Sequence, residues 1–359
     1  MLDYRDLVKN IYEWTQADGR VFTERLQNAL EKYCECVSDG VKYEGYGDTN
    51  DLLNLNPVYL PDRKFKRDLK ELCERIQRTY SDYNNGTIAK CIENKWWGKY
   101  KEKWHYERVN ANGITTYYRM RSKVEGTKNH KTFKRKDLFH TPYEKRELIK
   151  SYRYSMIGMP CLYLGCSIYV CWEEMRRANI NNLMIAAFRL KDGEKLNLLD
   201  LRIQRDLGQA TSSDLKEYLM ALPLIIACSF KTQSDEGIYK PEYVFPQLVM
   251  HMIVKDSASK RTIDGVIYDT TQQEEDFKNY IGHDLRVIEN IAIPVYEVAD
   301  KGYCSRLSEM FSLTQPTTSE YEANKESVFG IASDRQEENT LFYILEERLR
   351  EMDFASINE

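Results

Sequence analysis

The residues best suited to chemistry lie between positions 138 and 175, where Arg153 is followed by the adjacent pair Glu173 and Glu174. An arginine presents a planar, permanently charged donor fork that binds phosphate groups through two hydrogen bonds. A glutamate carboxylate stabilises positive charge that develops during a reaction. Arg153 and the two glutamates are therefore candidates for binding an anionic ligand and for stabilising positive charge.

The elements that must position these side chains can be predicted from the same stretch. Arg153-Tyr154-Ser155 precedes a turn at Gly158-Met159-Pro160, which is followed by a buried strand over Cys161–Leu164 and a break at Gly165. Ser167 is a suitable N-cap for a helix that continues to Arg177. Two neighbouring residues on a helix point in different directions, so at most one of the two glutamates faces the strand.

The order and spacing of several short motifs resemble the RES-domain family, which is named after its Arg, Glu and Ser signature. Tyr163 is the middle residue of the LYL strand motif, and Glu174 follows eleven residues later on the predicted helix. The resemblance covers about residues 115 to 295, half of the chain. The matching motifs are Tyr118-Arg119, Arg153, Gly158–Gly165, Glu174, Tyr243–Gln247 and Gly265–Thr270.

Members of this family resemble ADP-ribosyltransferases in fold and consume NAD+ by splitting the bond between nicotinamide and ribose, in some cases by phosphorolysis. The resemblance therefore implies NAD+ as substrate, inorganic phosphate as a co-substrate in the phosphorolytic case, no cofactor and no metal. It implies that Arg119 and Arg153 clamp the pyrophosphate and that Glu174 supports the cationic ribose or the nucleophile. Tyr154, Tyr163 and Thr270 would orient the substrate, and Arg119, Arg153, Glu174 and Thr270 would form the catalytic set.

Two departures from the family pattern bear on this assignment. Thr270 stands where the family has its signature Ser, so a hydroxyl is kept on a side chain with less rotational freedom. Tyr152 and Ser155 replace the Gly before the second Arg and the Asn after it. The motif spacing also leaves open whether Glu173 or Glu174 is the functional carboxylate.

The resemblance implies a toxin or defence effector, because unchecked NAD+ depletion would poison the cell that makes the enzyme. Such an enzyme needs restraint, either from a neutralising antitoxin or from self-inhibition by its own terminal regions. One form of self-inhibition would place the acidic segment 301–359 over the site, in which case its deletion would raise activity. Transfer of ADP-ribose to a macromolecule is the alternative reaction, since it breaks the same bond.

The pattern of the whole chain predicts an α+β fold, with an ADP-ribosyltransferase-like split mixed β-sheet as its core. We expect an N-terminal helical region over residues 1–110, a catalytic domain over 111–300 and an acidic, helical C-terminal tail over 301–359. Apolar residues at helical spacing predict a helical pair before residue 40 and helices over 63–80, 167–177, 215–228 and 336–352. Alternating or short apolar runs predict strands over 114–121, 161–164, 184–190, 195–201, 243–254 and 265–268.

A nucleic-acid-binding module is the alternative from a different functional class. Residues 61–150 hold 24 Lys and Arg against 12 Asp and Glu, although the chain as a whole has a net charge of -4. Basic and aromatic residues alternate over Lys95–Tyr106, and a second basic cluster spans His130–Lys136. The opposing interpretation, which we favour, is that Trp96, Trp97 and Trp104 pack the N-terminal helices on the catalytic domain, with the lysines solvated around them.

The remaining features favour a cytoplasmic enzyme. No apolar run reaches the roughly 20 residues that a spanning helix needs, because the best one, Leu219–Phe230, is short and contains Pro223. The first residues carry charges where an export signal would be apolar. Nine cysteines without a paired CxxC pattern and five histidines without HxxxH or HxH spacing predict reduced core thiols and no metal site.

Overall fold

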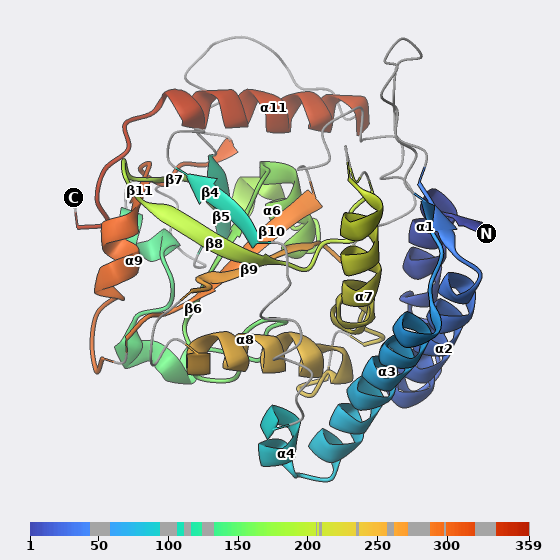
Figure 1. Ribbon diagram of the computed structural model, residues 1–359. Coiled ribbons are helices and arrows are strands. Elements are labelled where there is room, and N and C mark those ends of the chain that lie inside the picture. Colours follow the sequence, from blue (N-terminus) through green and yellow to red (C-terminus); the bar gives the residue numbers. More distant parts are fainter. Residues whose placement is uncertain are drawn as a thin grey trace. The chain divides into compact units, whose positions relative to one another are not determined.

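The computed structural model (Figure 1) describes residues 1–43, 58–93, 106–110, 116–123, 133–205, 207, 210–234, 237–256, 262–271, 288–297, 299–319 and 335–358. The chain divides into two compact units: Met1–His105 with Leu201–Met252, and Tyr106–Asp200 with Ile253–Glu359. Residues 201–252 thus group with the N-terminal helices. The predicted boundaries at residues 110 and 300 separate regions by function, whereas these units are separated by compactness. The functional division therefore stays a prediction.

The first unit is mainly helical. It contains α1 (Tyr4–Trp14), α2 (Phe22–Ser38), α3 (Arg63–Asn84), α4 (Ile88–Glu93), α7 (Ser212–Ser229) and most of α8 (Val244–Asp256). A small sheet is built from β1 (Leu2–Asp3), β2 (Val41–Lys42) and β3 (Val58–Tyr59). Side chains cap three of these helices, since Asp3, Asp62 and Thr211 accept hydrogen bonds from backbone N–H groups of the first turn. The predicted helices at the N-terminus, over 63–80 and over 215–228 are confirmed.

One predicted strand is wrong: residues 243–254 form the short 3-10 helix η5 (Pro241–Tyr243) and helix α8 instead. Val244, Phe245, Val249 and Ile253 are buried. A short run that is apolar throughout has no periodicity to separate a buried strand from a buried helix. Pro246 is compatible with the helix because it lies in the first turn, where backbone N–H groups have no partner within the helix.

The second unit is built on an eight-stranded mixed sheet in the order β11-β7-β5-β6-β10-β9-β8-β4. All neighbours pair antiparallel except β8 and β9, which are parallel. The predicted α+β class is confirmed. The strands are β4 (Tyr106–Asn110), β5 (Tyr117–Ser122), β6 (Cys161–Gly165), β7 (Leu183–Leu190), β8 (Lys195–Asp200), β9 (Gly265–Asp269), β10 (Glu289–Pro294) and β11 (Phe311–Leu313).

The middle of this sheet is its weakest junction. The register between β5 and β6 consists of one pair, Tyr118 opposite Gly165, whereas β5 pairs with β7 from Tyr117 to Ser122. Gly165 is required here because a Cβ atom would lie 2.6 Å from Val170 and 2.7 Å from Cys171 of the following helix. Helix α6 (Ile168–Glu174) can therefore lie directly against the sheet beside this junction.

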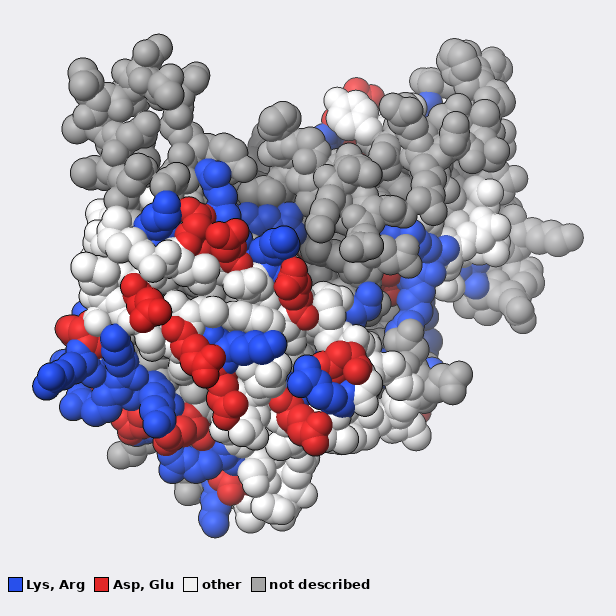
Figure 2. Space-filling model, turned by 90° about the vertical axis from the view of Figure 1, so that its right-hand side faces the viewer, with Lys and Arg blue, Asp and Glu red and all other residues white. Residues whose placement is uncertain are grey.

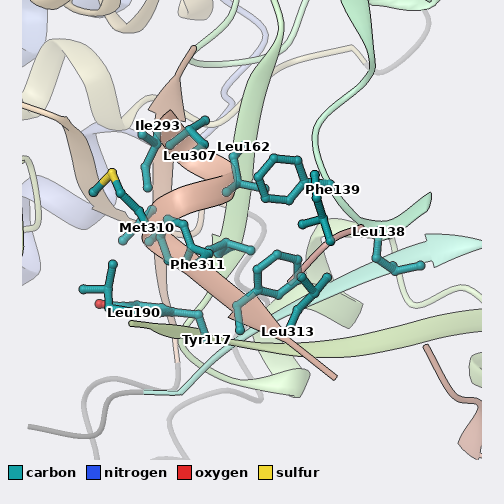
Figure 3. Packing of buried hydrophobic residues seen from close by; sticks show 14 of the residues in the cluster. Tyr117, Leu138, Phe139, Leu162, Leu190, Ile293, Leu307, Met310, Phe311 and Leu313 are labelled. Carbon is teal, nitrogen blue, oxygen red and sulfur yellow. The ribbon is translucent and has the colours of Figure 1, made fainter. Parts of the chain in front are cut away.

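Alternation along the central strands sends apolar and polar side chains to opposite faces. Leu162, Leu164, Ile267, Ile291 and Ile293 belong to one buried cluster, part of which is shown in Figure 3. Because successive side chains of a strand point to opposite faces, the intervening Tyr163, Tyr268 and Asn290 point away from this cluster. On β5, Tyr118 and Met120 belong to a second cluster, which contains residues of α6 and α11 (Arg335–Glu351).

Short helices complete the second unit around the two clusters. Leu138 of the 3-10 helix η2 (Arg135–Leu138) and Tyr143 of η3 (Tyr143–Leu148) join the first cluster together with α9 (Ser305–Met310). The 3-10 helix η4 (Ile180–Asn182) leads into β7. One face of β6, β10 and β9 is thus packed against the first buried cluster.

The described C-terminal residues contribute to both buried clusters. Phe311 and Leu313 of β11 lie in the first cluster, and β11 pairs with β7. Phe342, Leu345 and Leu349 of α11 lie in the second cluster. The apolar spacing of the sequence predicts that Leu341, Ile344, Leu345 and Leu349 point inward. For Ile344 this prediction is wrong, because the buried stripe follows spacings of three and four residues from Phe342 and leaves Ile344 39% exposed. The predicted inward position of Leu341 lies outside the described side chains.

Candidate functional site

The predicted carboxylate Glu174 lies where three segments of the second unit meet. Oγ1 of Thr270 donates to Oε1 of Glu174 at 2.7 Å, and Nδ2 of Asn290 donates to the same oxygen at 3.1 Å. Thr270 directly follows β9, Asn290 belongs to β10, and Glu174 is the last residue of α6. Both donors are buried, with 3% and 5% of their surface exposed. They fix the orientation of a carboxylate that itself keeps solvent access.

The adjacent Glu173 has a structural environment. Its carboxylate accepts hydrogen bonds from Oη of Tyr169 and, at 3.0 Å, from Nε of Arg177. It also forms an ion pair with Arg177 at 2.8 Å, and only 4% of the residue is exposed. The geometry therefore separates the two candidates: Glu174 lies with Thr270, while Glu173 holds the end of its own helix together.

Helix α6 ends immediately after Glu174, earlier than predicted. Ser167 caps its start as predicted, since its side chain accepts from the backbone N–H of Val170 at 2.9 Å. Arg176 and Arg177 then adopt left-handed backbone angles, with φ of 57° and 52°. This conformation costs roughly 1–2 kcal/mol for a non-glycine residue. The ion pair and hydrogen bond between Arg177 and Glu173 help to offset that cost.

Arg153 is the positive group of this site. It is 8% exposed, and its NH2 group donates to Oγ1 of Thr271 at 2.6 Å. Thr271 directly follows Thr270, so two consecutive hydroxyls engage groups of opposite charge. The positive charge of Arg153 also acts on the Glu174 carboxylate. The structure thus brings Arg153, Glu174 and Thr270 together, as the sequence predicts.

The two predicted substrate-binding tyrosines contact the loop that carries Arg153. Oη of Tyr163 accepts from the backbone N–H of Tyr154 at 3.2 Å and donates to Oγ of Ser155 at 2.9 Å. Tyr163 is partly exposed, whereas Tyr154 is 1% exposed and its ring centroid lies 4.4 Å from that of Tyr268. Tyr154 therefore offers little surface for stacking on a ligand, and its buried ring anchors the chain beside Arg153.

Arg119 lies at the junction between β5 and β6. Its NH1 group donates to the backbone carbonyl of Tyr163 at 2.6 Å, and the residue is partly buried. This bond connects the two strands next to their single paired position. The described contacts therefore link Arg119 to the backbone of β6. They do not include a contact with Glu174, which is held by Thr270 and Asn290. The predicted role of Arg119 on the pyrophosphate stays a prediction.

The electrostatic balance at Glu174 has opposing contributions. Desolvation by the surrounding protein raises the pKa of its carboxyl group above the usual range. The hydrogen bonds from Thr270 and Asn290 and the charge of Arg153 act in the opposite direction, because they favour the ionised form. The negative charge of Glu173 adds to the upward shift, while the solvent access of Glu174 lets water stabilise the ionised form as well.

Sequence reasoning missed Asn290 and Thr271. Asn290 lies in the run Glu289–Pro294, where every residue is buried. A buried polar side chain requires a hydrogen-bond partner, so an Asn between apolar residues of a strand was the available signal. Thr271 directly follows Thr270, and nothing in the sequence spacing distinguishes which hydroxyl faces which charge.

Several arginines of the basic region, residues 61–150, have partners within the protein and are not held out for phosphate groups. On α3, Arg67, Arg75 and Arg78 form ion pairs with neighbouring acidic residues. Arg135, in the second basic cluster, is 7% exposed and donates to the carbonyl of Leu313 at 2.9 Å. Figure 2 shows basic and acidic side chains interspersed over the described part of one face. Trp96, Trp97 and Trp104 lie outside the described residues.

Within the described part of the chain, no group of three or more His, Cys, Asp or Glu side chains is placed to hold a metal ion. None of its helices has the length and apolar character needed to cross a membrane.

The comparisons with known proteins give one named relative. The chain is 32% identical over 228 residues to a protein of Bacillus subtilis (strain 168) named "Putative toxin YopC". The match covers 59% of this chain and 48% of that protein, so the chain spans about half the length of this relative. No known family model matches the chain. No solved structure matches it either.

Proposed function

We propose that the second unit is an enzyme that cleaves the nicotinamide–ribose bond of NAD+, with phosphate or water as the acceptor. The observation that carries this proposal is the arrangement at Glu174: a carboxylate oriented by Thr270 and Asn290 lies in the field of the buried Arg153. The motif resemblance to RES-domain proteins supplies the substrate. The name of the Bacillus subtilis relative supports a toxin role, which NAD+ depletion would explain.

Each residue has a defined task in this reaction. Arg153 would bind the pyrophosphate, held in orientation by its hydrogen bond to Thr271. As nicotinamide leaves with the bonding electron pair, C1 of the ribose becomes positively charged, and Glu174 would stabilise that charge or orient the attacking phosphate or water. Thr270 and Asn290 keep one carboxylate oxygen in place, so the second oxygen can serve the substrate. Arg119 would add positive charge near the phosphates from β5, which lies between β7 and β6 in the sheet.

Product analysis tests the reaction directly. The purified chain is incubated with NAD+, with and without phosphate, and the products are identified by mass spectrometry. ADP-ribose-1″-phosphate would establish phosphorolysis, ADP-ribose would establish hydrolysis, and ADP-ribose attached to a macromolecule would establish transfer. Release of no nicotinamide under any of these conditions would refute the proposal.

Variants at the site assign the activity to this geometry. Glu174→Gln keeps the size of the side chain and one acceptor oxygen for Thr270 and Asn290 but removes the charge, so we expect at least a 100-fold loss of kcat. Glu347→Gln, an exposed Glu→Gln change on α11, is the matched control and should retain full activity. Equal activity in the two variants would place the reaction elsewhere.

A further inference from the structure

Two cysteines of the first unit face each other between α2 and α3. The Sγ atoms of Cys34 and Cys73 lie 3.4 Å apart. Cys34 is partly exposed, and Cys73 is 4% exposed. The two helices pack through Leu30, Leu69 and other apolar residues that are almost completely buried.

Both sulfur-bearing side chains line a pocket of about 520 Å³ between these helices. Lys66, Lys70 and three glutamates also line it, so a small polar molecule has a route to the sulfurs. A disulfide needs an S–S distance of about 2.05 Å. The sulfurs must therefore approach by little more than 1 Å, a movement that side-chain rotation and a small helix shift can provide.

The surroundings of Cys34 favour its thiolate. Its pKa is lowered by the hydrogen bond with the Cys73 thiol and by the nearby Lys70. Cys36, two residues further along the same helix, has the opposite tendency, because desolvation raises its pKa. The thiolate is the nucleophilic form of cysteine, so Cys34 is the more reactive of the two neighbours on α2.

We propose that Cys34 and Cys73 form an oxidisable dithiol, which a hydroperoxide converts into a disulfide joining α2 to α3. The Cys34 thiolate attacks the terminal peroxide oxygen, which becomes part of a sulfenic acid, while the alkoxide or hydroxide leaves and takes up a proton. The Cys73 sulfur then attacks the Cys34 sulfur, and the sulfenic hydroxyl leaves as water with the thiol proton. The two thiols lose two electrons, and the peroxide is reduced to water and an alcohol or a second water.

This modification is independent of the proposed reaction on NAD+, because both cysteines belong to the first unit. The disulfide would close a loop from α2 to α3 and restrict the unfolded chain, which stabilises the folded state. We therefore expect the oxidised first unit to unfold at a higher temperature and to resist proteolysis better than the reduced form.

Peptide mapping of the full-length chain tests the proposal. The reduced protein is treated with a small excess of hydrogen peroxide, alkylated and digested without reductant. We expect a linked peptide pair containing Cys34 and Cys73, lighter by two hydrogen atoms than the separate peptides and separated again by dithiothreitol. Cys36→Ser should form the same linkage, whereas Cys34→Ser should not.

The outcomes that would overturn the proposal are equally specific. A linkage of Cys34 to a different cysteine, or conversion of Cys34 to sulfinic acid without any linkage, would show that Cys73 does not act as the resolving thiol. Persistence of both thiols, at peroxide levels that oxidise free glutathione, would show that the pair is not oxidisable. Because the wild-type chain gives these answers, they do not depend on the folding of a variant.

Discussion

The side-chain amide of Asn290 donates to Oε1 of Glu174 at 3.1 Å, although 116 residues separate them in the sequence. Asn290 stands in a fully buried strand, and its amide is directed to the same carboxylate oxygen that accepts from Thr270. A buried amide at this position contributes little to apolar packing. Its contact with Glu174 indicates that Asn290 positions the carboxylate.

Replacing Asn290 should therefore affect the chemical step more than substrate binding. A hydrogen bond to a charged group contributes about 1.5–3 kcal/mol, so we expect Asn290→Ala to lower kcat by about 10-fold to 100-fold with little change in KM. Asn290→Asp should lower it further at neutral pH, because a second carboxylate beside Glu174 raises the pKa of the pair. Steady-state kinetics on folded variants, checked by circular dichroism, measure both effects. An increase in KM with unchanged kcat would argue against this role.

Thr270 provides a test of the hydroxyl itself. Thr270→Ser keeps the donor to Glu174 and introduces the signature residue of RES-domain proteins, so we expect activity within about threefold of the wild type. Thr270→Val preserves shape but removes the donor, which should lower kcat by about tenfold or more. Since this hydrogen bond lowers the pKa of Glu174, its loss should move the acidic limb of the pH–rate profile to higher pH. Equal pH profiles for the two variants would contradict this assignment.

The positions of Glu174 and Thr270 could be predicted from the sequence because local signals determine the helix and the strand that carry them. The Ser167 N-cap sets the start of α6, and the close approach at Gly165 sets its distance from β6. Together they place Glu174 at the C-terminal end of α6, a helix that packs against β6. Thr270 could be predicted because it follows a short apolar strand in a recognisable motif.

Other parts depended on long-range packing that the sequence does not display. Asn290 and Thr271 acquire their partners only when β9, β10 and α6 meet, and no local spacing encodes that meeting. Arg119 has the residue type of a phosphate ligand, but its hydrogen bond to the Tyr163 carbonyl arises from the short pairing between β5 and β6. Helix α8 was missed because its apolar residues cover all of its sides.

His140 should make the stability of the second unit depend on pH. Its Nδ1 lies 2.8 Å from the carbonyl of Thr141, and its Nε2 accepts from the backbone N–H of Cys304 at 2.9 Å. This arrangement requires the neutral ring, and burial lowers the pKa of His140 from 6.5 to about 4. The unfolded chain therefore binds a proton at higher pH than the folded chain does. Stability is fully present above pH 6.5 and falls as the pH drops towards 4.

Denaturant unfolding of wild type and His140→Gln, measured between pH 7.5 and 4, isolates this contribution. The shift corresponds to about 3 kcal/mol of stability lost by the wild type across the window. Glutamine can accept the hydrogen bond from Cys304 but does not titrate, so the variant should show a shallower pH dependence. Parallel stability curves for the two proteins would mean that protonation of His140 is not coupled to folding.

The adjacent residues Phe342 and Tyr343 of α11 test whether the C-terminal region is part of the fold. Phe342 is 3% exposed, and its ring lies 5.8 Å from Tyr169 and 5.3 Å from Trp172 of α6. Phe342→Ala should lower the free energy of unfolding by about 3–5 kcal/mol, because it leaves a cavity beneath the helix that carries Glu174. Tyr343 is 64% exposed, so Tyr343→Ala should change it by less than about 0.5 kcal/mol.

Deletion of residues 301–359 extends the same argument to the whole region. The deletion removes β11 from the sheet together with Phe311, Leu313 and the buried stripe of α11, so we expect an insoluble or unfolded second unit. A removable inhibitory tail would instead leave a folded enzyme with higher turnover of NAD+. Comparing the solubility, circular dichroism and nicotinamide release of the truncated and full-length chains separates the two cases, and the buried positions of Phe311 and Phe342 favour the loss of folding.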